Sequence, residues 1–211
     1  ADKKLYALRD VTGTVSSMPL IASSIMSKKL ASGADCILLD VKYGSGAFMK
    51  TKKDAKKLAE IMINIGRHLG KDVRAEVTDM DQPLGYAVGN NLEIKEVIET
   101  LHNRGPKDLT KLCLDSGSIM LVQAKLFHDK KEARKALLKN LKNGKAFEKF
   151  VEFVKAQKGD TSYILDPSKF EVAKNIIPIY SNKEGVIKRI DALTIGKSSM
   201  KLGGGRERIE D

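Results

Sequence analysis

The sequence predicts an α/β fold, and three features of its first half carry that prediction. A short apolar run over residues 36–41 follows Gly33 and is typical of a buried strand. Residues 54–69 place apolar side chains at helical spacing and end before Gly70. A second candidate strand covers residues 73–80. Because strand, helix and strand alternate, we expect a sheet buried on both faces by helices.

The remaining segments before residue 160 predict further helices. The first 31 residues read as two helices around a break at Gly13, with Pro19 suited to the first turn of the second helix. Apolar spacing predicts a helix near residues 94–101 and another over residues 108–127.

The pattern of the sequence changes beyond Pro167. Proline and glycine residues there separate short β-like segments, such as residues 185–190. We therefore place a domain boundary near residues 165–178.

Composition and charge exclude several classes of protein. The chain has 211 residues, 42% of them hydrophobic, which excludes a disordered or fibrous chain. Its 38 Lys and Arg against 27 Asp and Glu give a net charge of +11, which invites a nucleic-acid interpretation. Residues 125–160 carry much of this surplus, but apolar residues interleave with the cations there. That pattern favours an amphipathic helix pair with a solvated lysine face.

The cysteines and the apolar segments indicate the cellular compartment of the protein. Cys36 and Cys113 lie far apart without metal-ligand or CxxC spacing, so we expect two core residues in a reducing, cytoplasmic protein. No apolar run approaches the roughly 20 residues that a membrane-spanning helix needs. The first residues also lack the apolar stretch of a secretory signal.

The densest group of polar side chains lies near the N-terminus. Tyr6 and Arg9 are three residues apart on one helix face, and Ile21, Ser24 and Lys28 share a face of the next helix. Cations on two neighbouring helices with a hydroxyl between them suit a planar polar ligand. The alternative is an ion-paired arginine, a packed serine and a solvated lysine, and spacing alone favours this alternative.

Five segments make the sequence resemble a known family. They are LYALRDVTGTVSSMPLIASSIMSKK (residues 5–29), LDVKYGSGAFM (residues 39–49), TDMDQPLGYAVGN (residues 78–90), the helix of residues 93–100 and MKLGGGR (residues 200–206). In this order they closely resemble pyrimidine-nucleoside phosphorylases and the related thymidine phosphorylases. The resemblance covers nearly the whole chain.

The resemblance implies a reaction and a site for the pyrimidine base. The family cleaves a pyrimidine nucleoside (uridine, thymidine or deoxyuridine) with phosphate as co-substrate, giving the free base and a pentose 1-phosphate. By resemblance Arg9, Lys28 and Ser24 bond the carbonyl edge of the base, with Arg9 and Lys28 as the catalytic cations. Ile21 would lie against the base and Tyr6 would line the pocket.

A monovalent cation site, for K⁺, is also implied by the resemblance. Its ligands in this chain would be the backbone carbonyls of Leu84 and Ala87 and the carboxylate of Glu96. Oxygen ligands of this kind suit a hard cation. The alternative for Glu96 is a solvated carboxylate early in a helix, where it favours the helix dipole.

The family architecture implies three parts. Residues 1–31 would belong to a helical domain, residues 32–170 would form a large α/β domain with a mixed sheet flanked by helices, and residues 171–211 would begin a C-terminal α+β domain. The family's glycine-rich phosphate-binding signature has no match in these residues, and position 1 is not Met. We therefore expect the central-to-late part of a phosphorylase, inactive by itself and homodimeric when full-length.

Two further interpretations remain open from the sequence. The first is a folded module without catalytic activity. The second is a basic module that binds nucleic acid through residues 125–160. The solvated lysine face makes the second the minority interpretation.

Overall fold

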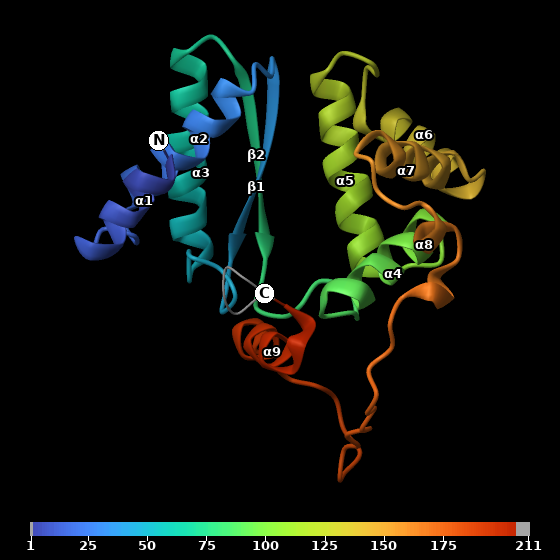
Figure 1. Ribbon diagram of the computed structural model, residues 1–211. Coiled ribbons are helices and arrows are strands. Elements are labelled where there is room, and N and C mark those ends of the chain that lie inside the picture. Colours follow the sequence, from blue (N-terminus) through green and yellow to red (C-terminus); the bar gives the residue numbers. More distant parts are fainter. Residues whose placement is uncertain (1, 206–211) are drawn as a thin grey trace. The chain divides into compact units, whose positions relative to one another are not determined.

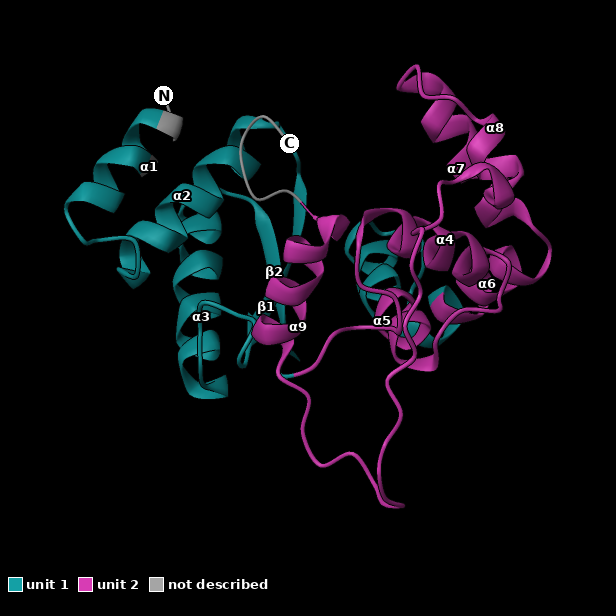
Figure 2. Cartoon of the chain, turned by 60° about the horizontal axis from the view of Figure 1, so that its bottom comes forward, with its two compact units in different colours: residues 1–81, 115–133 teal, residues 82–114, 134–211 magenta. Residues whose placement is uncertain are grey.

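A computed structural model describes residues 2–205, apart from the side chains of Asp2, Lys3 and Tyr6 (Figure 1). The chain divides into two compact units, shown in different colours in Figure 2. Unit 1 consists of residues 1–81 and 115–133, and unit 2 consists of residues 82–114 and 134–211. These limits come from contacts within the chain and leave the three predicted domains as predictions.

Unit 1 contains the predicted helix pair and the predicted strand–helix–strand. Its elements are α1 (Asp2–Val11), α2 (Met18–Ala31), β1 (Cys36–Tyr43), α3 (Lys52–His68) and β2 (Asp72–Asp79). The two strands are parallel, with Cys36 opposite Asp72 and Tyr43 opposite Asp79. They form the sheet of the described residues, so the α/β prediction is confirmed and the sheet seen is small and parallel.

The core of unit 1 lies between the sheet and two helices. Alternate residues of β1 are buried, and α3 covers that face of the strands (Figure 1). Helix α2 packs against α3 and adds Ile21 and Met26 to the same core. The prediction of a strand buried on both faces was wrong, because Cys36 and Asp40 on the opposite face of β1 are exposed. Leu38 and Lys42 on that face are half-buried, so the face is only partly covered.

Helix α5 (Lys107–Gln123) belongs partly to unit 1, through residues 115–123. The side-chain amide of Gln123 is buried and donates hydrogen bonds to the carbonyl oxygens of Ile37 (3.2 Å) and Asp72 (2.7 Å). Ser116 donates from its hydroxyl to the carboxylate of Glu76. These bonds tie the helix to the amino-terminal ends of both strands and to the middle of β2.

Unit 2 is helical within the described residues. Its elements are α4 (Asn90–Leu101), the first half of α5, most of α6 (Lys130–Lys142), α7 (Lys145–Ala156), α8 (Ser162–Leu165), the 3-10 turn η1 (Pro167–Lys169), α9 (Ala192–Ser199) and the π-type turn η2 (Met200–Gly204). The predicted helix pair within residues 125–160 is confirmed as α6 and α7. No helix of the described chain is long and apolar enough to cross a membrane.

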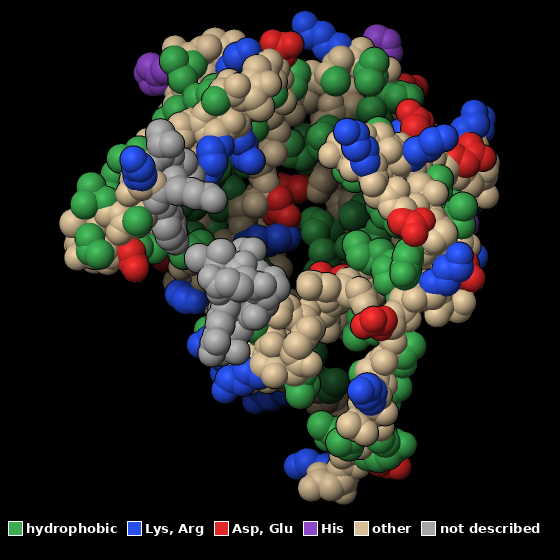
Figure 3. Space-filling model, in the orientation of Figure 1, with side chains coloured by type: hydrophobic (Ala, Val, Ile, Leu, Met, Phe, Trp, Pro, Cys, Tyr) green, Lys and Arg blue, Asp and Glu red, His purple; other side chains and the backbone are tan. Residues whose placement is uncertain are grey.

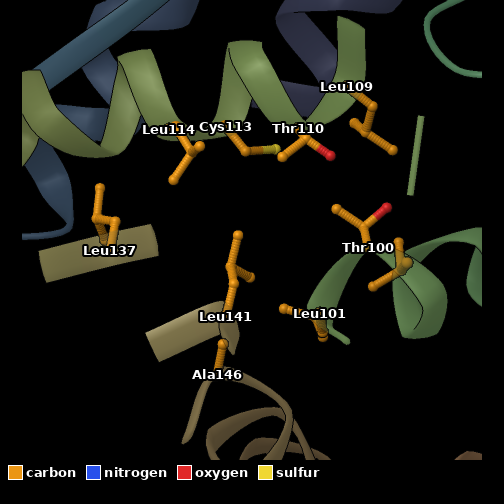
Figure 4. A pocket seen from close by; sticks show the side chains of 10 residues that line it. Thr100, Leu101, Leu109, Thr110, Cys113, Leu114, Leu137, Leu141 and Ala146 are labelled. Carbon is orange, nitrogen blue, oxygen red and sulfur yellow. The ribbon is translucent and has the colours of Figure 1, made fainter. Parts of the chain in front are cut away.

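An apolar cavity of about 260 Å³ lies between α4, α5, α6 and α7. Leucine side chains from three of these helices point into it, and the Cys113 thiol lies at its side (Figure 4). The predicted burial of both cysteines was wrong, since Cys36 and Cys113 are exposed. Cys36 begins a strand on its polar face, and Cys113 borders the open cavity.

The tail of the described chain differs from the prediction. Residues 171–191 contain neither helix nor strand, so the β-like segment 185–190 forms no strand here. Ile179 and Val186 are each 94% exposed. A strand requires a partner for its backbone hydrogen bonds, which the described chain does not supply to this segment. Regular structure resumes at α9, where the Thr194 backbone N–H bonds the Asp191 carboxylate and lowers its pKa.

Packing at Gly66 of α3 gives a test of the unit 1 core. A Cβ at this position would overlap the side chain of Val73 on β2. Gly66→Ala should therefore lower the free energy of unfolding by about 1–3 kcal/mol, as overpacked cores do. Urea unfolding measures this change. The matched control is Gly196→Ala in α9, where a Cβ meets no atom within 4 Å. Equal midpoints for the two variants would contradict the packing.

Candidate functional site

Arg9 sits at the junction of the first two helices. It lies in the last turn of α1, and its Nη2 donates to the Val15 carbonyl oxygen at 2.5 Å. Its Nη1 lies 3.5 Å from the carbonyl oxygen of Leu20, in the first turn of α2. The guanidinium is thus held against the start of α2, because the carbonyls of the connecting turn fix its plane.

The three predicted residues on α2 differ in how far their side chains are exposed to solvent. Ile21 is 7% exposed and belongs to the unit 1 core, Ser24 is half-buried, and Lys28 is exposed. The Lys28 Nζ lies 3.4 Å from the Ser24 Oγ, so the two polar side chains meet one turn apart. Packing of α2 on the core therefore holds the hydroxyl and the ammonium at the solvent edge of this face.

Together these contacts bring Arg9 to the first turn of α2 and Ser24 and Lys28 to the turns that follow. A cation from α1 and a hydroxyl and a cation from α2 can donate hydrogen bonds to the oxygens of a planar ligand. The side chain of Tyr6 lies outside the described part of the structure, so its predicted role in lining the pocket stays a prediction. Ile21 is placed mainly as a core residue, which leaves only its edge for a ligand.

The loop between β2 and α4 meets the side chain of Glu96. The Glu96 Oε1 accepts hydrogen bonds from the backbone N–H of Tyr86 (2.8 Å) and of Ala87 (3.0 Å). Gly85 has a φ of +73°, and a Cβ there would overlap Glu96 Oε2. Glycine is required because it adopts this conformation and leaves room for the carboxylate. The structure therefore brings Glu96 to the loop that carries Leu84 and Ala87.

The donor chemistry of this loop fits a hard monovalent cation. Glu96 offers a half-buried carboxylate to this loop, the loop offers main-chain carbonyl oxygens, and oxygen atoms are the ligands that such ions prefer. Within the described residues, no three His, Cys, Asp or Glu side chains come together as a metal site. That observation concerns side-chain clusters and not a site built from one carboxylate and main-chain oxygens.

A second polar cluster lies at the carboxyl ends of the parallel strands. Lys42 donates to Asp40 Oδ2 at 2.6 Å and to Thr78 Oγ1 at 2.9 Å, and the Thr78 hydroxyl donates to Asp40. The strand register makes this possible, since Lys42 is directly opposite Thr78. Ligands of α/β proteins commonly bind at this end of a parallel sheet.

The loops that follow both strands are bonded to each other at the same end of the sheet. The Ser45 backbone N–H donates to Asp81 Oδ1 at 2.8 Å, and the Ser45 hydroxyl donates to the Asp81 carbonyl oxygen at 3.0 Å. Residues 44–51, which follow β1, connect it to α3.

Sequence patterns missed two contributors to these sites. The Asp40–Lys42–Thr78 cluster depends on strand register, although the alternation of Asp40 and Lys42 on one strand face was visible in the sequence. Asp108 binds the Gly85 backbone N–H at 3.0 Å. Its position in the first turn of a predicted helix gave no sign of a bond to a loop 23 residues earlier.

Comparison with known proteins places the chain among related sequences. It is 56% identical over 211 residues to the pyrimidine-nucleoside phosphorylase of Bacillus subtilis strain 168, covering all of this chain and 49% of that protein. The pyrimidine-nucleoside phosphorylase of Staphylococcus epidermidis is 55% identical over 211 residues, and the chain covers 49% of that protein. The protein of Geobacillus stearothermophilus is 53% identical over 210 residues, with 48% of it covered.

The chain therefore spans about half the length of the curated relatives it matches. Residues 1–147 match the family described as glycosyl transferase family, a/b domain, a span that includes α1 to α5 and the parallel sheet. From this match and the α/β fold that carries it, the chain belongs to the glycosyl transferase family through its a/b domain.

Proposed function

We propose that the protein catalyses phosphorolysis of pyrimidine nucleosides and that this chain supplies the base side of the site. The observation that carries the proposal is 53–56% identity, over the whole chain, to relatives named pyrimidine-nucleoside phosphorylase. The meeting of Ser24 and Lys28 on α2, with Arg9 against the start of that helix, supports the proposal. A pyrimidine presents its two carbonyl oxygens to donors of this kind.

The chemistry follows from where charge develops. The bond between the sugar C1 and the base nitrogen breaks, and its electron pair leaves with the base. Phosphate supplies an oxygen that bonds C1, and the base takes up a proton when it is released. Lys28 and Arg9 donate hydrogen bonds to the base oxygens, where negative charge increases during cleavage. Fixed cations stabilise this transition state more than the neutral nucleoside, so they raise the rate of cleavage.

The rest of the proposal concerns the intact protein. Its substrates are uridine, thymidine or deoxyuridine with phosphate, and residues outside this chain bind the phosphate. Residues 1–31 belong to a helical domain, residues 32–170 to a large α/β domain with a mixed sheet, and residues 171–211 begin an α+β domain. The intact protein is a cytoplasmic homodimer. The coverage of only 49% of the Bacillus subtilis relative supports a longer intact protein.

The proposed cation site holds K⁺ through the carbonyls of Leu84 and Ala87 and the carboxylate of Glu96. Glu96 already binds this loop through two backbone N–H groups, which supports its assignment. A bound K⁺ would supply a fixed positive charge that steadies the loop and the helix α4 that follows it. Further ligands of the ion would come from residues outside this chain.

The distribution of basic side chains gives less support to nucleic-acid binding than the comparisons give to phosphorolysis. On the face shown in Figure 3, Lys and Arg side chains are spread over the surface and alternate with apolar and acidic ones. Binding through phosphate contacts relies on clustered cations. We therefore keep phosphorolysis as the proposed function and nucleic-acid binding as the alternative.

Lys28 provides the test of the base site. Lys28→Ala in the intact protein should lower kcat/KM for uridine phosphorolysis by about 10²–10³-fold, the usual effect of removing one transition-state donor. Steady-state release of uracil measures it. Lys29→Ala is the matched control, because Lys29 is the next residue of α2 and is also exposed. Equal kcat/KM values for the two variants would rule out the assignment of Lys28.

Glu96 provides the test of the cation site. Wild-type protein should unfold at a higher temperature in KCl than in choline chloride of equal ionic strength, because a bound ion stabilises the folded state. Glu96→Gln should lose most of this difference, since it removes the charge and keeps an oxygen for the N–H groups of Tyr86 and Ala87.

The control for Glu96 is one turn away on the same helix. Glu93→Gln makes the same change of charge at a carboxylate that binds only the Gly89 backbone N–H among the contacts described, at 3.0 Å. It should keep the difference between the two salts. A loss of that difference in both variants would show that net charge, and not the Glu96 ligand, determines the effect of KCl.

A further inference from the structure

The two carboxylate oxygens of Asp108, in the first turn of α5, accept hydrogen bonds from two different segments of the chain. Its Oδ1 accepts the backbone N–H of Leu109 at 2.9 Å, which satisfies a donor of the first helical turn. Its Oδ2 accepts the backbone N–H of Gly85 at 3.0 Å, in the loop before α4. One carboxylate thus joins the start of a helix to a loop far away in the sequence, and both residues belong to unit 2.

The bond to Gly85 fixes the direction of a different group, the Leu84 carbonyl. The N–H of Gly85 and the C=O of Leu84 belong to one planar peptide unit, and no cis peptide occurs in the described chain. In a trans peptide these two groups point in opposite directions. Because the N–H points to Asp108, the Leu84 carbonyl oxygen must point away from it.

The next two peptide units are held from another side. Glu96 accepts the N–H groups of Tyr86 and Ala87, so three consecutive N–H groups of the loop bind two carboxylates. Asp108 is the partner of the first of these peptides, and Glu96 is the partner of the other two. Glu96 therefore does not bind the Leu84–Gly85 peptide, and the bond to Asp108 is the described contact that restrains its rotation.

We propose that Asp108 is a positioning residue for the cation site, which holds the Leu84 carbonyl in the orientation that binds K⁺. This inference rests on the proposed cation site and adds a residue that does not touch the ion. Partners of this kind, bound to a ligand and not to the metal, set metal affinity by fixing ligand geometry. Without Asp108, the Leu84–Gly85 peptide can rotate and the carbonyl loses its fixed direction.

The experiment measures K⁺ affinity through thermal unfolding of the intact protein. The unfolding temperature is followed against KCl concentration, with choline chloride keeping the ionic strength constant. Asp108→Ala should raise the K⁺ concentration at half-maximal stabilisation by about 10-fold or more. Asp108→Asn keeps one oxygen acceptor for Gly85 and should give a smaller increase. The variants are compared by their response to K⁺, so a general loss of stability does not obscure the result.

Asp54→Ala is the matched control, because Asp54 is an acidic residue in the first turn of α3 and lies in unit 1. Its K⁺ titration should match that of the wild type. An Asp108→Ala titration that also matches the wild type, with only a lower unfolding temperature in both salts, would show a purely structural role and overturn the inference.

The same measurements separate this inference from the proposals on which it rests. A wild-type protein without any K⁺-specific stabilisation would overturn the cation site and the role of Asp108 together. Phosphorolysis would still be judged by the Lys28 variant. A K⁺ effect that depends on Glu96 and not on Asp108 would keep the site and remove only the positioning role.

Discussion

Burial of one face of α2 is the constraint on which the candidate base site depends. Ile21 and Met26 are packed into the unit 1 core with α3 and β1. Since that face is fixed inside, the rotation of the helix about its axis is fixed too, and Lys28 reaches solvent with Ser24 beside it. Arg9 joins them because its guanidinium binds carbonyls of the turn and of the first turn of α2. Apolar packing of α2 thus determines the position of Lys28, and hydrogen bonds to main-chain carbonyls determine that of Arg9.

A different force organises the second site. The loop between β2 and α4 contains few buried apolar groups, and its backbone N–H groups are bound by carboxylates from α4 and α5 instead. A charged acceptor makes a stronger hydrogen bond with a backbone N–H than a neutral one does. Gly85 makes the close approach of Glu96 possible, because any Cβ at this position would overlap the carboxylate. Loop shape and carboxylate position therefore depend on each other.

The two sites use charge in opposite ways. At the candidate base site, main-chain oxygens and a hydroxyl hold two cations, which in the proposed function stabilise negative charge on the base. At the loop, carboxylates bound by N–H groups accompany main-chain oxygens that suit a positive ion. The net charge of +11 reveals neither arrangement, because most of the basic residues lie elsewhere on the surface.

The sequence by itself determined the local elements and the residue types of both sites. Apolar spacing predicted α3, α6 and α7, because it reflects which face of a helix is buried, and a short continuous apolar run predicted β1. Only the tertiary structure decided the bond of Asp108 to Gly85, the Asp40–Lys42–Thr78 cluster and the exposure of Cys36 and Asp40 on one face of β1. These depend on strand register and on contacts between residues 23 to 38 positions apart. A pattern of neighbouring residues carries no information about such contacts, since packing of whole elements brings them together.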